Sequence, residues 1–60
     1  MLVKAFENKG VSVRLVLNTD TDEHSVTIIH KDKSRIDSGP MEFKRADAYF
    51  TLAQYQIARL

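Results

Sequence analysis

The sequence predicts an α+β fold in which a three-stranded antiparallel β-meander packs against one C-terminal α-helix (β-β-β-α). Apolar and polar residues alternate along the first half of the chain, which is typical of strands that are buried on one side. In the last third, apolar residues recur every three or four positions, which is typical of an amphipathic helix. With 60 residues, the chain is expected to form a single domain, residues 1–60.

The first two strands are predicted over residues 2–7 and 11–18 as a β-hairpin. The sequence Asn8-Lys9-Gly10 between them favours a type I turn, which Gly10 would close with a bulge because glycine tolerates a positive φ. The second strand alternates cleanly. Its inward side consists of Val11, Val13, Leu15 and Leu17.

The inward side of the first strand is ambiguous. We expect Leu2 and Phe6 to face the core, with the Lys4 stem lying along the edge of the apolar surface. The alternative, in which Val3 and Ala5 face inward, fits the apolar pattern almost as well and stays open.

The third strand is predicted over residues 24–31, with Val26 and Ile28 facing the core. It follows an acidic loop, residues 19–23, which is short enough to join antiparallel neighbours. A second polar loop is predicted over residues 32–39.

The helix is predicted from about Pro40 to near Leu60. Gly39 is expected to act as its N-cap, Pro40 fits the first helical position, and Glu42 would complement the positive end of the helix dipole. Tyr49 flanks the stripe that should pack on the sheet. This stripe consists of Phe43, Ala46, Phe50, Ala53, Ile57 and Leu60.

A second row of residues lies on the opposite side of the helix, where one small sheet cannot cover it. It consists of Ala48, Leu52, Tyr55 and Arg59. The outer side of the sheet also carries apolar residues, Val16 and Ile29. They are either scattered surface residues, partly covered by Ile36 and Met41, or contacts with another chain.

The size and composition of the chain leave a well-packed monomer or an oligomer, and the surplus apolar surface favours the oligomer. Chains this short often need a disulfide, a metal or a partner subunit for stability, and this one has no cysteine and only two histidines. We therefore expect a homodimer. Arg59 and Arg14 would lie at the rim of an interface formed by the helix row, or by Val16 and Ile29.

The sequence argues against an enzyme, a cofactor or a metal site. His24 and His30 would lie about 20 Å apart along one strand, too far to share a metal or a proton. Asn18, Asp20 and Asp22 alternate as in a calcium loop, but the glycine and glutamate that such a loop requires are missing. No glycine-rich phosphate loop precedes the helix.

We therefore predict a non-enzymatic binding module that self-associates and contacts another macromolecule. Its size would suit an accessory protein of a phage or mobile element, or a subunit of a larger assembly. No apolar run could span a bilayer, the first residues do not resemble a signal peptide, and the expected location is the cytoplasm. The helix is also not expected to bind a membrane surface.

The alternative function is a small DNA- or RNA-binding regulator. Basic residues concentrate between positions 30 and 45, whereas acidic residues concentrate in the loop 19–23, although the net charge is only +1. The residues that would contact phosphates are Arg14, Lys31, Lys33, Arg35, Lys44 and Arg45.

Overall fold

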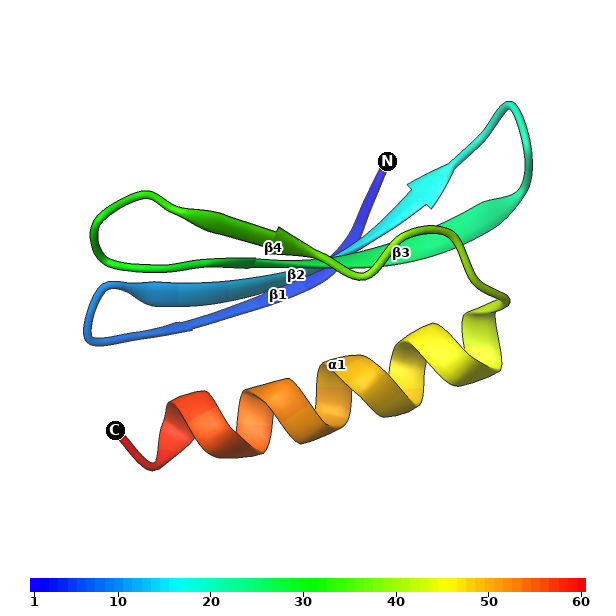
Figure 1. Ribbon diagram of the computed structural model, residues 1–60. Coiled ribbons are helices and arrows are strands. Elements are labelled where there is room, and N and C mark those ends of the chain that lie inside the picture. Colours follow the sequence, from blue (N-terminus) through cyan, green and yellow to red (C-terminus); the bar gives the residue numbers. More distant parts are fainter.

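The computed structural model describes residues 1–60 as one β-sheet with one helix across one of its sides (Figure 1). The elements are β1 (Leu2–Asn8), β2 (Val11–Asn18), β3 (Glu23–Ile29), β4 (Arg35–Asp37) and α1 (Phe43–Ala58). The sheet is antiparallel, with the strand order β1-β2-β3-β4. The predicted meander packed on a C-terminal helix is confirmed, but the sheet has a fourth strand.

The fourth strand lies within residues 32–39, where the sequence predicted only a loop. Arg35–Asp37 pairs with the end of β3, and the chain then continues along the same edge, where Met41 forms a bridge with His24. The prediction missed this strand because three residues with one apolar side chain, Ile36, show no alternation that indicates a strand. The predicted third strand was also too long, because His30 and Lys31 lie in the β3–β4 turn.

The β1–β2 turn is tighter than predicted. Asn8 pairs directly with Val11, so that Lys9 and Gly10 alone form the turn. Both residues have a positive φ, 53° and 82°, which is the pattern of a type I′ turn, the connection that best suits the twist of a two-residue hairpin. The predicted type I turn with a bulge is therefore wrong.

A bulge does occur, but at the beginning of β1. The register shifts between Leu2 and Lys4, so that Val3 is the extra residue. Lys4 pairs with Leu15 and therefore faces the helix, whereas Leu2 pairs with Val16 on the outer side of the sheet. The expectation that Leu2 faces the core is wrong because the bulge reverses the side on which Leu2 lies.

Phe6 pairs with Val13 and packs half-buried against the core, as the first of the two alternatives for this strand predicted.

The helix begins three residues later than predicted. Met41 is still paired with His24, with backbone N···O distances of 2.7 and 2.8 Å, so its backbone cannot enter the helix. Glu42 is the N-cap residue, in an extended conformation and without a capping side-chain bond. Gly39 is not the cap; it has a φ of +79° and lies in the short break between the hydrogen bond of Ser38 to Val26 and the pairing of Met41 with His24.

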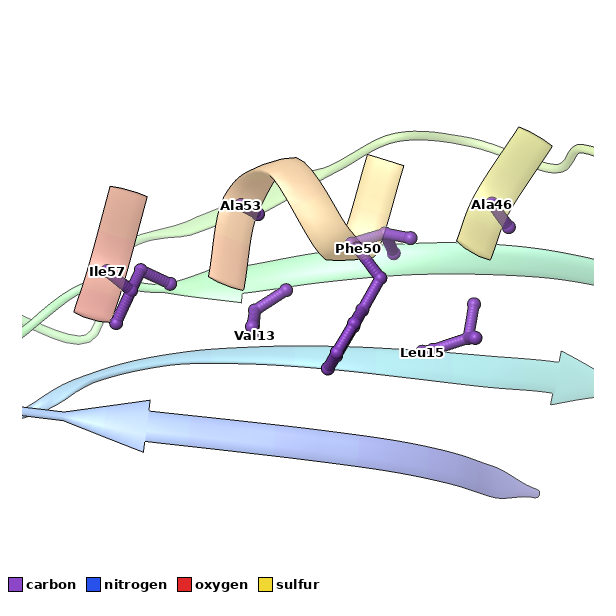
Figure 2. Close-up of a cluster of buried hydrophobic side chains, with 7 residues drawn as sticks. Val13, Leu15, Ala46, Phe50, Ala53 and Ile57 are labelled. Atoms are coloured by element: carbon purple, nitrogen blue, oxygen red, sulfur yellow. The ribbon is translucent and has the colours of Figure 1, made fainter. Parts of the chain in front are cut away.

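The core is a single apolar layer between α1 and the two central strands (Figure 2). Phe50 points from the helix between Val13 and Leu15. The full set of buried residues is Val13, Leu15, Val26, Ala46, Phe50, Ala53 and Ile57. Of the other sheet residues predicted to face the core, Val11, Leu17 and Ile28 are half-buried.

Two residues predicted for the core stripe of the helix are largely exposed. Phe43 is 49% exposed, and its ring contacts His24 on the inner side of β3, with 5.1 Å between centroids. Leu60 is 54% exposed because it lies beyond the end of the helix.

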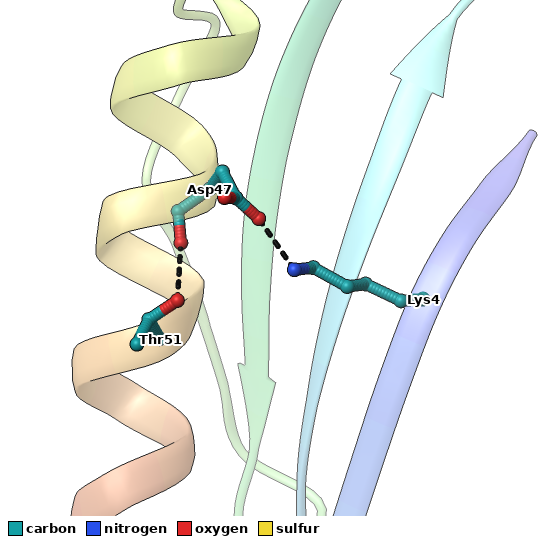
Figure 3. Close-up of polar contacts among 3 residues, drawn as sticks. All are labelled: Lys4, Asp47 and Thr51. Carbon is teal, nitrogen blue, oxygen red and sulfur yellow. Dashed lines mark hydrogen bonds and ion pairs between the residues drawn. The ribbon is translucent and has the colours of Figure 1, made fainter.

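Two polar contacts tie α1 to the edge strand β1. Lys4 reaches under the helix and forms an ion pair with Asp47, and its ammonium lies 4.8 Å from the centre of the Phe50 ring (Figure 3). At the other end, the Asn8 amide donates a hydrogen bond of 2.9 Å to the Ile57 carbonyl in the last helical turn, which also accepts from the Leu60 N–H at 3.2 Å. These contacts fix the helix on the β1 side of the sheet.

We predict that Phe50→Ala costs about 3–5 kcal/mol of the free energy of unfolding, because it leaves a cavity in the only core. This is comparable to the whole stability of so small a domain, so the variant should be largely unfolded. Leu52→Ala, on the exposed side of the same helix, should change the stability by less than about 0.5 kcal/mol. Denaturation in dilute solution followed by circular dichroism measures both, and a severe loss with Leu52→Ala would contradict the assignment of helix sides.

We also predict that Lys4→Ala destabilises the fold by about 1 kcal/mol or less. The ion pair is partly exposed and screened by solvent, but the Asp47 oxygen that faces Lys4 is itself shielded and would lose its only partner. A double-mutant cycle with Asp47→Ala should give a coupling of roughly 0.5 kcal/mol, and additive losses would show that the pair does not hold the helix. Lys44→Ala, an exposed lysine on α1, is the control and should leave stability unchanged.

Candidate functional site

The helix leaves part of the sheet uncovered. It packs against β1, β2 and β3 but does not reach β4. On β4, Ile36 pairs with Ile28 and therefore lies on the same side of the sheet as the helix, yet its side chain is 51% exposed. The inner side of the sheet next to β4 is thus open to solvent.

A shallow apolar groove runs along α1 on this open side. One part, of about 220 Å³, lies between Ile28 and the helix residues Tyr49, Leu52, Ala53 and Gln56. It adjoins a second part, of about 210 Å³, that continues to the end of the helix at Leu60. The largest side chains along this groove define what we call the groove face. They are Ile28, Tyr49, Leu52 and Leu60, and we include Ile36, which lies beside Ile28 on β4.

The helix residues predicted as interface contacts are all exposed. Leu52 is 68% exposed and Tyr55 is 70% exposed, and no element of the chain covers either of them. Leu52 borders the groove, whereas Ala48, Tyr55 and Arg59 lie on the side of the helix that faces away from the sheet. Ile36 and Met41 do not cover this row, because Ile36 lies beside Ile28 and Met41 packs against the core.

The sheet residues predicted as the alternative interface do not form one patch. Val16 pairs with Ser25, and Ile29 pairs with Ser12, on the outer side of the sheet. The polar pair Arg14 and Thr27 lies between these two rows. Val16 and Ile29 are half-buried, and the apolar neighbour that Val16 does have is Leu2, which the bulge in β1 places beside it.

The two edges of the sheet are poorly suited to pairing with another strand. β1 carries a bulge and an inward-facing lysine, Lys4, and both features discourage the approach of a further strand. β4 has three residues, and its edge is interrupted at Gly39 and Pro40 before Met41 pairs with His24. The groove face is therefore the best candidate for contact with another protein.

The six predicted phosphate-binding residues are spread over the molecule. Lys31 and Lys33 lie in the β3–β4 turn, beside the end of α1, whereas Lys44 and Arg45 lie in the first turn of α1, at the other end of the molecule. Arg14 and Arg35 are on the outer side of the sheet, in β2 and β4. The structure does not bring these cations together on one surface.

A different basic cluster forms where the two hairpin turns meet, at the left in Figure 1. Gly10 of the β1–β2 turn lies so close to Lys31 that a Cβ atom on it would be 3.3 Å from the Lys31 side chain. Lys9 and Lys33 belong to the same two turns, and Arg59 follows the end of α1 there. We call Lys9, Lys31, Lys33 and Arg59 the basic end. The sequence analysis missed Lys9 because it lies far from the others along the chain.

Acidic residues collect at the opposite end. Asp20, Asp22 and Glu23 lie in or next to the β2–β3 turn. Glu42 precedes α1 at the same end, since the neighbouring residues Met41 and Phe43 both contact His24. We call Asp20, Asp22, Glu23 and Glu42 the acidic end.

The two histidines lie apart, and one of the carboxylates is engaged in local hydrogen bonds. His24 and His30 lie at the two ends of β3, and no three metal-ligating side chains come together. The Asp32 carboxylate accepts two hydrogen bonds from the nearby Ser34, one from its hydroxyl at 2.7 Å and one from its backbone N–H at 3.0 Å. These hydrogen bonds, and more weakly the nearby His30, hold the pKa of Asp32 below its ordinary value.

Comparisons with protein families, with curated proteins and with solved structures found nothing that matches the chain. The helix α1 is neither long nor apolar enough to cross a membrane.

We predict that Ser34→Ala raises the pKa of Asp32 toward its ordinary value, because the stronger of its hydrogen bonds is lost. The native pKa is lowered, so Asp32 contributes stability above its unfolded-state pKa, and this contribution is lost as the pH falls through its folded-state pKa. In Ser34→Ala, the contribution of the Asp32 carboxylate to the stability of the fold should become smaller. Titration of the Asp32 carboxyl by NMR measures the shift; Ser12→Ala is the control, and an unchanged Asp32 titration in Ser34→Ala would contradict the assignment.

Proposed function

We propose that this chain is a non-enzymatic interaction module that self-associates through the groove face and presents its remaining surface to another macromolecule. The observation that supports it is the gathering of large exposed apolar side chains on and beside α1. Isolated exposed apolar residues are ordinary on protein surfaces, but a contiguous cluster on so small a chain is typical of a binding site.

Burial of these side chains would supply the driving force for association. Burying a leucine or isoleucine side chain that is otherwise in water contributes roughly 1.5–3 kcal/mol. Leu52 and Ile36 are both more than half exposed; Leu52 lines the groove, and Ile36 lies beside Ile28, which also lines it. A partner that covers this part of the groove face would remove both side chains from water.

The size of the surface sets a further condition. A standard interface covers about 800 Å² per partner, which is roughly a fifth of the 4403 Å² surface of this chain. A molecule measuring 33 × 20 × 15 Å can offer such an area only on a broad side. The outer side of the sheet is divided by Arg14 and Thr27, so the broad side formed by the groove face and α1 is the better candidate.

The DNA- or RNA-binding alternative is less well supported. Affinity for phosphates depends on several cations acting together, and the six candidate residues lie on three separate parts of the molecule. The net charge of +1 adds little attraction of its own.

The test is the oligomeric state of Leu52→Asp. The wild-type chain should sediment at equilibrium as a concentration-dependent dimer, and Leu52→Asp should sediment as a 6.9 kDa monomer with an unchanged circular dichroism spectrum, because an exposed position tolerates the charge whereas an apolar interface does not.

Thr51→Asp is the matched control, because Thr51 is the neighbouring exposed helix residue and does not line the groove. This variant should dimerise like the wild type. A wild-type chain that stays monomeric, or a Leu52→Asp variant that still dimerises, would refute the proposed interface.

A further inference from the structure

The charges of this chain are divided along its longest dimension, which measures 33 Å. Asp32 lies at the basic end, and Lys44 and Arg45 lie at the acidic end, but each end keeps an excess of its own charge. The basic end lies where α1 ends, since Asn8, next to the β1–β2 turn, bonds to the Ile57 carbonyl. The acidic end lies where α1 begins, since Met41 and Phe43 contact His24 beside the β2–β3 turn. Because α1 runs from one end to the other, the direction of the helix is also the direction of the charge separation.

We propose that the occupant of the groove face is a second copy of this chain, related by a twofold axis near Leu52, so that the two α1 helices run antiparallel. This inference rests on the proposed function and adds the identity and the orientation of the partner. The charge complementarity between the two ends of the molecule is the argument for it.

Antiparallel helices place the basic end of each copy beside the acidic end of the other. Both junctions are equivalent by symmetry, and both are attractive. Parallel helices would instead bring two basic ends together and two acidic ends together, which is repulsive at both junctions. The distribution of charge therefore selects one of the two orientations in which the same apolar surfaces could meet.

The shape of the groove face also suits a twofold contact. A twofold interface uses the same patch on both copies, so the patch must hold both a projection and a recess that receives it. Leu52 projects at the rim of the groove, and the recess beside it is floored by Ile28 and Ala53. Leu52 also lies within one turn of the middle of α1, so that an axis beside it leaves similar lengths of helix on both sides.

The test is a charge exchange between the two ends. One variant combines Lys31→Glu with Lys33→Glu, and the other combines Asp20→Lys with Glu23→Lys. All four side chains are exposed, so circular dichroism should show both variants folded. At low ionic strength each variant alone should dimerise roughly tenfold more weakly than the wild type, because its copies meet with like charges at both junctions.

Mixing the two variants is the decisive step. In the mixed dimer both junctions again join opposite charges, so native mass spectrometry should show the mixed dimer in preference to either homodimer. Arg14→Glu, on the outer side of the sheet, is the control and should dimerise like the wild type. Added salt should weaken the wild-type dimer, because it screens the attraction between the ends.

The outcomes separate this inference from the proposed function. If both charge variants dimerise like the wild type while Leu52→Asp is monomeric, the groove face is the interface but the antiparallel arrangement is wrong. If a charge variant dimerises more tightly than the wild type, like ends meet and the helices are parallel. If the wild type itself does not associate, both are overturned, and the groove face is left for a protein other than this chain.

Discussion

One helix is too narrow to cover a four-stranded sheet, and most features of this molecule depend on that mismatch. An α-helix with its side chains is about 10–12 Å across. The axes of the outer strands of a four-stranded sheet are about 14 Å apart, and the side chains of those strands extend further. A chain of 60 residues has no second helix to complete the layer. Part of the side of the sheet that faces α1 must therefore remain open to solvent. The position of the helix determines which part this is.

Polar contacts at β1 determine where the open part lies. Lys4 and Asn8 hold α1 at its middle and near its end, and both belong to the same edge strand. The bulge in β1 makes this possible, because it sets the register in which Lys4 and Phe6 face the helix while Leu2 faces the other way. With the helix fixed over β1, β2 and β3, the uncovered strand is β4, and Ile36 is exposed as a consequence. The bulge and Lys4 also protect the β1 edge from pairing with another strand.

The sequence was sufficient to predict the parts of the fold that depend on long apolar patterns. The alternation in β2 and the helical spacing from Ala46 to Ile57 correctly identified most of the core. The parts that were missed depend on contacts between distant residues. β4 is stabilised by pairing with β3 and not by its own composition, and the start of α1 is delayed because Met41 is held by His24.

The candidate site was predictable only in part. The exposed helix row could be computed from the spacing of its residues, so Leu52 and Tyr55 were identified correctly as exposed. The groove could not be found, because it lies between α1 and Ile28 of β3 and depends on where the helix lies across the sheet. The division of charge was visible as a basic and an acidic segment, but Lys44 and Arg45 lie at the other end from Lys31 and Lys33, which only the fold reveals.

The central claim, that the open side of the sheet next to β4 is the contact surface, is tested most directly by a dilution series followed through backbone amide NMR shifts. The account predicts that the signals of Ile28, Ile36, Tyr49 and Leu52 move together as the protein is diluted, while those of Arg14 and Thr27 on the outer side of the sheet stay in place. Shifts confined to the outer side, or none over the whole concentration range, would contradict it.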